Sequence, residues 1–311
     1  MAVQRFSAGL IGLAMLAAAP AAAETLHVTG VFAAGARDAS RLSTIAVGPF
    51  GGADGAALGD AIERRLRALD REPLPHVRVI AASLRPDAVL TGRTSVGVVD
   101  DAYREPRERC AETKDGKCVR RQRYSVGCIR RTVTLRADLT LDGRGRYAPV
   151  RTRDDRHDWC EDGGVPGNVA ASVAAMIESV AAETRDDLAP KPADYTIRLD
   201  ETRDGLPPPL AARFKAAVRL TKHDSAAACA AFAAIDQDAP DHGPTMYDLA
   251  LCAEAAGRYG EAADRYLRAR VLLPRAGGEI SRGLARVASL AAGAEDVAAL
   301  RRLPPVVGSG L

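Results

Sequence analysis

The sequence predicts an α/β (or α+β) N-terminal domain with a mixed sheet, followed by an all-α C-terminal domain of paired helices. Strand-like apolar runs alternate with helical periodicity before residue 190, and apolar positions recur at one fixed, longer spacing after residue 209. A length of 311 residues fits two domains. Alanine supplies much of the 47% hydrophobic content and aromatic residues only 4%, which favours closely packed helices.

The stretch 1–23 has the features of a secretory signal peptide. Arg5 supplies a positive charge, residues 8–19 form an apolar stretch too short to span a bilayer, and small residues precede Glu24. We expect cleavage after Ala23, with a membrane anchor as the alternative. The residue directly after that position is Glu24 and not a cysteine, so a lipoprotein is not expected, and no later segment is apolar enough to span a membrane. The protein is therefore predicted to be secreted and to reside in the periplasm.

Four segments define the first half of the α/β domain. Residues 42–50 form a continuous apolar run typical of a buried strand, and glycines follow it. Residues 56–70 place four aliphatic side chains on one helical face. Residues 77–80 and 87–99 are again rich in valine and strand-like.

A hairpin and a helix complete this domain. Residues 132–141 alternate between apolar and polar side chains, as a half-buried strand requires. Asp142-Gly143 is a two-residue turn signal, and we expect the chain to return along residues 144–153. Residues 168–188 have the length and composition of a helix that covers the sheet.

Three of these segments resemble a bacterial envelope domain. They are "IAVGPF" (45–50), "LGDAIERRL" (58–66) and "DAVLTGRTSV" (87–96). The domain is shared by the curli-secretion lipoprotein family, the lipoprotein activators of penicillin-binding proteins and the N-terminal domain of the Tol–Pal translocation protein. The resemblance covers residues 42–188 and implies binding to other envelope proteins without catalysis. This chain departs from it by a cysteine-bearing insertion at 101–128.

A second resemblance concerns the C-terminal part. Residues of similar type recur about 34 positions apart. Alanine matches alanine, one aromatic ring matches another and proline matches proline, whereas Ile235 stands where the second repeat has a small residue. The pairs are Ala228 and Ala262, Phe232 and Tyr266, Ile235 and Ala269, Pro240 and Pro274. This pattern resembles the tetratricopeptide repeat, which has the same length and in which small residues let two helices cross closely. We expect repeats at 209–242 and 243–276, then a terminal helix pair at 279–293 and 294–303. A generic helical hairpin is the alternative.

Prolines separate the two parts, and they mark residues 191–208 as a linker. "YTIRL" within it is an alternative edge strand of the first domain. The predicted organisation is a signal peptide at 1–23, a disulfide-tied α/β envelope-binding domain at 24–190, a Pro-rich linker at 191–208, tetratricopeptide-like helical repeats at 209–303 and a flexible tail at 304–311.

The repeat resemblance implies a shallow protein-binding groove lined by the first helix of each pair. Its expected lining is Arg213, Ala217, Tyr247, Leu251 and Glu254. Core packing is the alternative role for Tyr247 and Leu251.

Six cysteines in an exported chain favour disulfides over zinc, because no tight C-x2-C pair is present. The hairpin turn places Cys128 opposite residue 157, and a slip or bulge of a few residues would bring it to Cys160, although four cysteines allow three connectivities. Stacked repeats would bring Cys229 beside Cys252, with two buried thiols as the alternative. The predicted bonds are Cys110–Cys118, Cys128–Cys160 and Cys229–Cys252.

Charge is uneven although the net charge is only +3. Between residues 104 and 156 there are 16 Lys and Arg against 8 Asp and Glu. The arginines of this hairpin are a candidate patch for an anionic polymer, lipid headgroups or an acidic protein face. The alternative is a solvated strand face whose charges prevent edge-to-edge pairing. The patch consists of Arg120, Arg121, Arg123, Arg130 and Arg131.

Motifs for catalysis are scarce. Asp155 and His157 share a strand face and form a candidate acid–base pair of a hydrolase, but no nucleophile motif accompanies them. "GRGRYA" (143–148) imitates a dinucleotide fingerprint, yet it lies in a predicted hairpin rather than between a strand and a helix. No basic stripe with interleaved aromatic residues is present for nucleic acid.

We therefore expect no enzyme, no catalytic residues, no cofactor, no metal and no nucleic-acid partner. The favoured function is a periplasmic adaptor or assembly factor that binds envelope proteins through the helical groove. The alternative function is a binder of anionic envelope glycan or lipid through the Arg-rich hairpin.

Overall fold

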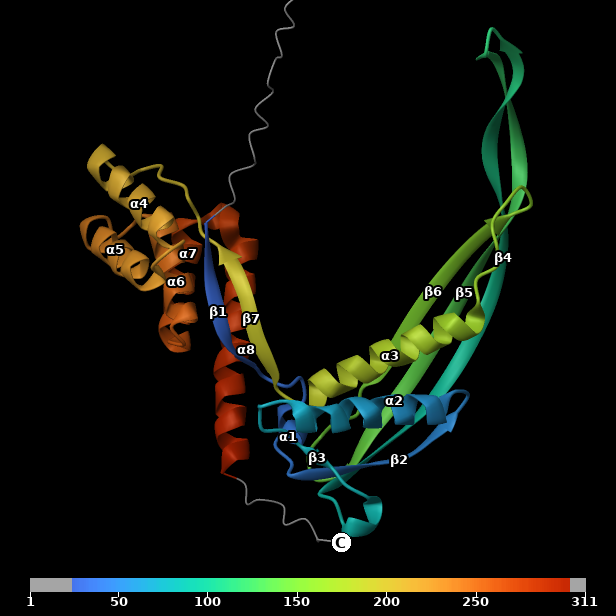
Figure 1. The fold of residues 1–311 in the computed structure, drawn as a ribbon, viewed down its shortest axis with the longest axis horizontal. Helices are drawn as coiled ribbons and strands as arrows, with labels where there is room; N and C mark the ends of the chain where they lie inside the picture. The colour runs from blue at the N-terminus through green and yellow to red at the C-terminus, as the bar shows by residue number, and fades with distance from the viewer. Residues whose placement is uncertain (1–23, 303–311) are drawn as a thin grey trace, which may run out of the picture.

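The structure, a computed structural model, describes residues 24–302 (Figure 1). The predicted signal peptide and tail lie outside the described residues. The chain forms an α/β body with a mixed sheet and a separate helical region that follows it in sequence. This agrees with the predicted fold class at the level of its two parts.

The body is built on one five-stranded sheet in the order β3-β2-β4-β5-β6. β2 runs parallel to β3 and β4, whereas β4, β5 and β6 are antiparallel neighbours, so the sheet is mixed as predicted. The strands are β2 (Thr44–Gly52), β3 (Arg78–Val79), β4 (Ala88–Lys114), β5 (Lys117–Gly143) and β6 (Val150–Cys160).

Helices α2 (Gly55–Ala68) and α3 (Val169–Leu188) cover one face of this sheet, and the other face is open (Figure 1). The alternation predicted for residues 132–141 explains why the helices pack on this face of the sheet. Val133, Leu135 and every second residue after them are buried in the core with the helices, and the residues between them face outward. Short helical turns complete the body: α1 (Arg37–Ser40), η1 (Leu69–Arg71) and η2 (Ala82–Leu84).

The hairpin between β5 and β6 differs from the prediction in its register. A two-residue turn at Asp142-Gly143 would place residue 157 opposite Cys128, whereas the structure pairs Cys128 with Cys160. The expected turn is wrong because Gly143 still belongs to β5, where it pairs with Ala88. The chain turns after it, through residues 144–149.

The helical region contains two antiparallel pairs and one long helix. Its elements are α4 (Pro208–Leu220), α5 (Ser225–Asp238), α6 (Gly243–Ala255), α7 (Tyr259–Leu272), η3 (Pro274–Ala276) and α8 (Gly277–Arg301). The expected terminal pair at 279–293 and 294–303 is wrong, because α8 continues through both. Gly293 does not end the helix; it lets α8 approach strand β1 (Thr25–Phe32) so closely that a Cβ there would lie 2.1 Å from the Val31 carbonyl oxygen. No helix among residues 24–302 has the length and apolarity to cross a membrane.

A two-stranded ribbon joins the two parts. β1 (Thr25–Phe32) pairs antiparallel with β7 (Lys191–Arg198), apart from the five-stranded sheet. Val28 on this ribbon is buried against Leu290 of α8. The structure therefore has a strand over 191–198, where a linker was expected, and that strand is not an edge of the body sheet.

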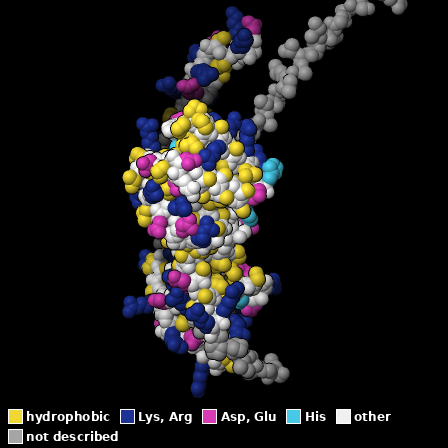
Figure 2. All heavy atoms as spheres, turned by 90° about the vertical axis from the view of Figure 1, so that its left-hand side faces the viewer, with side chains coloured by type: hydrophobic (Ala, Val, Ile, Leu, Met, Phe, Trp, Pro, Cys, Tyr) yellow, Lys and Arg dark blue, Asp and Glu magenta, His cyan; other side chains and the backbone are white. Residues whose placement is uncertain are grey.

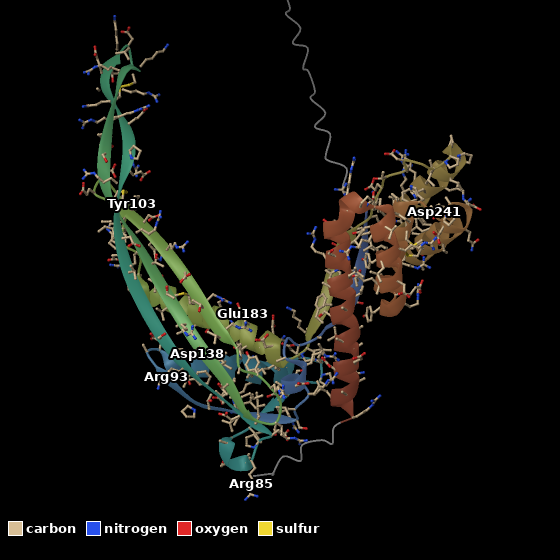
Figure 3. The ribbon with its side chains drawn as sticks, turned by 180° about the vertical axis from the view of Figure 1, so that it is seen from behind. Arg85, Arg93, Tyr103, Asp138, Glu183 and Asp241 are labelled. Carbon is tan, nitrogen blue, oxygen red and sulfur yellow. A yellow bond between two sulfur atoms is a disulfide. The ribbon has the colours of Figure 1, made fainter. Side chains whose placement is uncertain are left out.

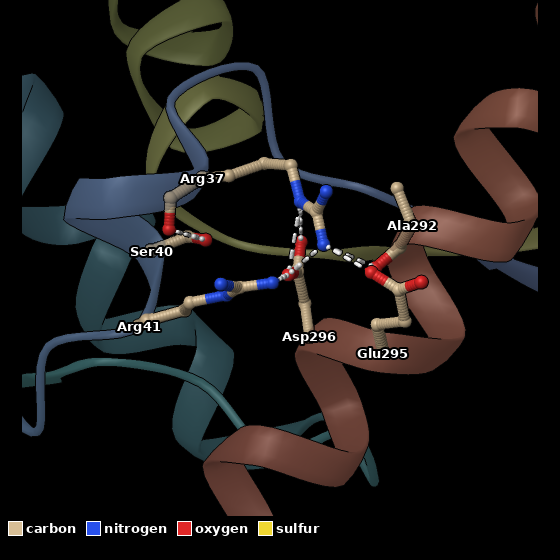
Figure 4. A network of polar contacts seen from close by, with 6 residues as sticks. All are labelled: Arg37, Ser40, Arg41, Ala292, Glu295 and Asp296. Carbon is tan, nitrogen blue, oxygen red and sulfur yellow. Dashed lines mark hydrogen bonds and ion pairs between the residues drawn. The ribbon is translucent and has the colours of Figure 1, made fainter.

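A buried carboxylate holds α8 against the body (Figure 4). Asp296 of α8 is fully buried and accepts hydrogen bonds from two guanidiniums, at 2.9 Å from Arg37 and 2.7 Å from Arg41. Arg37 also reaches Glu295, at 2.9 Å, and Asp296 and Glu295 raise the pKa of Arg37. A carboxylate without solvent contact is stable only because these cations neutralise it.

Asp296→Ala should lower the free energy of unfolding by about 2–3 kcal/mol, because it leaves two guanidiniums without their shared partner while they remain partly hydrated. Urea unfolding followed by circular dichroism measures this. Glu295→Ala is the matched control: its side chain is 68% exposed, and the loss should stay below about 1 kcal/mol. Equal losses in the two variants would contradict the role of Asp296.

Candidate functional site

The most conspicuous feature of the protein is an arm formed by residues 104–127, where β4 and β5 run on beyond the rest of the sheet (Figure 1). β6 ends opposite Cys128, so the arm is a ribbon of two strands only. Every residue from 106 to 123 except Ala111 is exposed. At about 3.3 Å per residue, each strand makes the arm roughly 35 Å long. Tyr103 marks its base (Figure 3).

Sequence reasoning located the cysteines of this segment but missed the arm itself. The signal was present: apolar alternation stops after residue 99, and Asp115-Gly116 is a hairpin turn. Both turn residues have positive φ, 52° and 73°, as a tight two-residue hairpin requires. The expected insertion at 101–128 is therefore an extension of two sheet strands.

Disulfides tie the arm at both ends. Cys128 and Cys160 are direct cross-strand neighbours at its base, with Cα atoms 4.0 Å apart. Cys110 and Cys118 close its tip. Cys229 and Cys252 join α5 to α6 in the helical region. These are the three pairs expected from the sequence. An isolated two-stranded ribbon is marginally stable in water, so the bonds compensate for the missing core.

The arginines of the candidate patch lie on the arm and its base, and each of them has a carboxylate within 3.5 Å. Glu108 pairs with both Arg121 and Arg123, and Glu112 pairs with Arg120. These contacts join the two strands of the arm. They support the alternative of a charged, solvated strand surface, and they weaken the case for an anion site there.

The same pairing holds at the base. Arg131 donates to Asp100 at 2.6 Å and Arg130 donates to Asp158 at 2.9 Å, each directly across the strands. These hydrogen bonds lower the pKa of both carboxyl groups, which therefore stay ionised at neutral pH. Arg131 also lies over the ring of Trp159, 5.1 Å from its centroid.

The arm keeps a modest positive charge after this pairing. Residues 104–127 contain eight Lys and Arg against four Asp and Glu. On the helical side of the molecule, basic, acidic and hydrophobic side chains are interspersed, and the arm rises above them with basic side chains toward its end (Figure 2).

The predicted protein-binding groove is not open in the structure. Ala217, Leu251 and Glu254 are buried, Tyr247 is only 8% exposed, and Arg213 is the one surface residue of the set. Arg213 pairs instead with Asp238 of α5. These five residues therefore do not form one accessible surface.

The chain's own ribbon explains this burial. Tyr195 of β7 donates a 2.7 Å hydrogen bond to Glu254, and Arg286 of α8 pairs with the same carboxylate at 2.9 Å. Tyr266 of α7 is the third donor, at 2.5 Å. The face of α6 that the repeat pattern reserved for a partner is thus occupied by β7 and α8.

The candidate catalytic residues Asp155 and His157 lie near a serine, but the three side chains are not arranged as a catalytic triad. Nε2 of His157 lies 3.0 Å from Asp155 and also 3.0 Å from the hydroxyl of Ser172 on α3. A relay needs the acid and the nucleophile on different ring nitrogens, whereas here both contact one. Ser172 is buried, and Gly167 packs so closely on the imidazole that a Cβ would lie 2.1 Å from it. This cluster is suited to fixing β6 on α3.

Among the described residues, one group has the ligand types and proximity for a metal: Glu105, Cys128 and Cys160. Both cysteines are oxidised to a disulfide, which removes the thiolates that zinc requires. The group therefore does not fit a zinc ion.

No protein-family model and no curated protein matches the sequence. Solved structures with some similarity include the PelC dodecamer from Paraburkholderia phytofirmans, with 18% identity, a TM-score of 0.23, and coverage of 51% of this chain and 96% of that one. A minor lipoprotein from Acinetobacter baumannii has 12% identity, a TM-score of 0.21, and coverage of 46% and 90%. Rare lipoprotein B from Shewanella oneidensis has 15% identity, a TM-score of 0.20, and coverage of 45% and 89%.

Lipoproteins also belong to the group that the N-terminal sequence resembles. Scores this low nevertheless carry no argument about the fold or the activity of this chain.

Replacing both Cys128 and Cys160 with serine should lower the free energy of unfolding by about 3 kcal/mol, because the bond closes a long loop at the edge of the folded body. Urea unfolding followed by the fluorescence of Trp159, the single tryptophan, measures the change.

The matched control replaces Cys110 and Cys118 with serine. That bond spans eight positions at the exposed tip, so its loss should loosen the tip and leave global stability within about 0.5 kcal/mol of the original. A tip variant that is destabilised as strongly as the base variant would contradict this account.

Proposed function

We propose that the protein is a secreted, non-catalytic adaptor of a bacterial envelope that engages a protein partner through its arm. The observation that carries the proposal is the exposure of the arm along nearly its whole length. A two-stranded ribbon of this size gains little stability from burial. Two disulfides and cross-strand ion pairs hold it, although no residue of the arm belongs to the main hydrophobic core of the body.

The chemistry of the arm fits a protein surface better than a polyanion. Its arginines are paired with acids, so it presents alternating charges with a modest positive excess. Val119 and Tyr124 add apolar area among them, and Arg109 lies over the Tyr124 ring. Tyrosine and arginine are enriched in protein interfaces, and mixed charge favours a partner with its own mixed charge.

The predicted export signal and the three disulfides favour an oxidising compartment, which supports a periplasmic location. The resemblance of residues 42–188 to envelope-binding domains supports the same setting. The helical region would then be a compact support for the arm-bearing body rather than the primary docking groove.

We also propose that α4–α7 are two tetratricopeptide-like repeats. The offset between the first residues of α5 and α7 equals the offset between Ala228 and Ala262, and each of these helices ends just before a proline. The small and large positions matched from the sequence are all buried between the helices; they are Ala228, Phe232, Ile235, Ala262, Tyr266 and Ala269. The same offset matches Ala216 with Ala250; Ala216 is exposed whereas Ala250 is buried, so the first repeat is the less regular one.

In-cell photocrosslinking tests the adaptor role. A photoreactive amino acid at Val119 on the arm should capture a discrete envelope protein, whereas the same probe at Leu84, at the opposite end of the body, should not. The two sites are matched in exposure, at 55% and 57%. Capture at Leu84 with none at Val119 would contradict the proposal.

A shortened chain provides a second, independent test of the adaptor role. Replacing residues 106–125 with a two-residue Asn-Gly turn keeps the base disulfide and removes no buried residue. The shortened protein should unfold at the original urea midpoint and no longer associate with the captured partner. Association at full strength would overturn the role of the arm.

A further inference from the structure

A cavity of about 610 Å³ opens at the end of the sheet opposite to the arm. It lies where β4 begins and β5 ends, beside α1. The polar side chains on its wall are Asp38, Arg41, Ser43, Asp87, Arg144 and Arg146. Its size is that of a site for a small ligand.

The turn after β5 is shaped to bring two arginines to this cavity. Gly143 and Gly145 have positive φ, 127° and 85°, which side chains rarely tolerate. Glycine at 145 suits both this φ and the close approach to α1, because a Cβ there would lie 3.2 Å from the Cα of Ala39. Arg144 and Arg146, on either side of Gly145, consequently share one wall with Arg41.

Two acidic residues lie at the same cavity, but one of them is committed to the fold. Asp87 accepts hydrogen bonds from the backbone N–H groups of Ser43 and Thr44, at 3.0 and 3.1 Å. Arg144 approaches it only at 3.5 Å, with a side chain that is 80% exposed. Asp38 is exposed and forms no ion pair within residues 24–302.

Arg146 differs from the arginines of the arm. Among the described residues it has neither an ion pair nor a hydrogen bond, whereas Arg120, Arg121 and Arg123 each have a carboxylate partner. Arg41 is held by Asp296, which fixes its position at the rim. Arg146 is therefore a cation that remains available to a ligand at this cavity.

We propose that this cavity binds an anionic sugar, with its carboxylate or phosphate held by Arg144 and Arg146. Guanidiniums bind both anions through paired, charge-assisted hydrogen bonds. Asp38 and the hydroxyl of Ser43 are placed to contact sugar hydroxyls on the same wall. The site does not depend on the adaptor role, because it lies at the far end of the sheet from the arm.

Isothermal titration calorimetry of the full mature chain tests the site with three probes. Tetragalacturonate carries carboxylates, glucose 6-phosphate carries a phosphate, and maltotetraose is neutral. At least one anionic probe should bind, the neutral one should not, and added NaCl should weaken binding. Binding of only one anionic probe identifies which anion the site takes.

The double variant Arg144→Gln/Arg146→Gln should weaken binding at least about tenfold, since it removes the charge-assisted contacts. Its control, Arg120→Gln/Arg121→Gln, removes the same charge from exposed positions on the arm and should bind within about twofold of the original. The urea midpoint verifies that both variants are folded. The site is refuted if neither anionic probe binds, if maltotetraose binds equally, or if the two variants lose affinity alike.

Discussion

The uninterrupted antiparallel pairing of β4 with β5 is the interaction on which the rest of the structure depends. It runs from Ala88 opposite Gly143 to Lys114 opposite Lys117, with irregularities only near Glu112. At one end its side chains form the centre of the body core; at the other they leave the sheet as the arm. One continuous register therefore sets both the packing of the helices and the direction of the exposed ribbon. A shift of the register by a single position would turn the buried face of β5 to solvent.

Contacts between the helical region and the rest of the chain cover the inner face of the helices. The ribbon of β1 and β7 lies on α6 and α8, Tyr195 reaches the buried Glu254, and Gly293 admits the close approach of β1. Asp296 adds an ionic contact with α1. Because this face is filled from within, the candidate surfaces for other molecules lie on the body, at the arm and at the cavity at the far end of the sheet. The arm presents cross-strand ion pairs, and the cavity presents Arg146, which has no ion pair among residues 24–302.

Much of the fold follows from local patterns in the sequence, and the failures have physical causes. Alternation over residues 132–141 indicated the buried face of β5, and the positions of the cysteines indicated the three disulfides. The turn was misplaced because Asp142-Gly143 is a strong hairpin signal, whereas pairing with Ala88 keeps Gly143 in the strand. The groove was misjudged because the contact of Tyr195 in β7 with Glu254 joins segments distant in sequence and leaves no local trace. Composition likewise showed the arginines of the patch but not the carboxylates that lie across the strands from them.

A distance measurement between the arm and the body tests the central claim most directly. Spin labels on unnatural amino acids at Val119 and Val150, both exposed, leave all three disulfides intact. Val150 pairs with Asp138, and the length of β5 between that position and Val119 predicts a separation of roughly 60 Å for a straight ribbon. A single narrow distribution at long distance is the expected result of electron–electron double resonance. A broad distribution, or one centred at short distance, would show that the arm folds back or does not form, and would contradict the account.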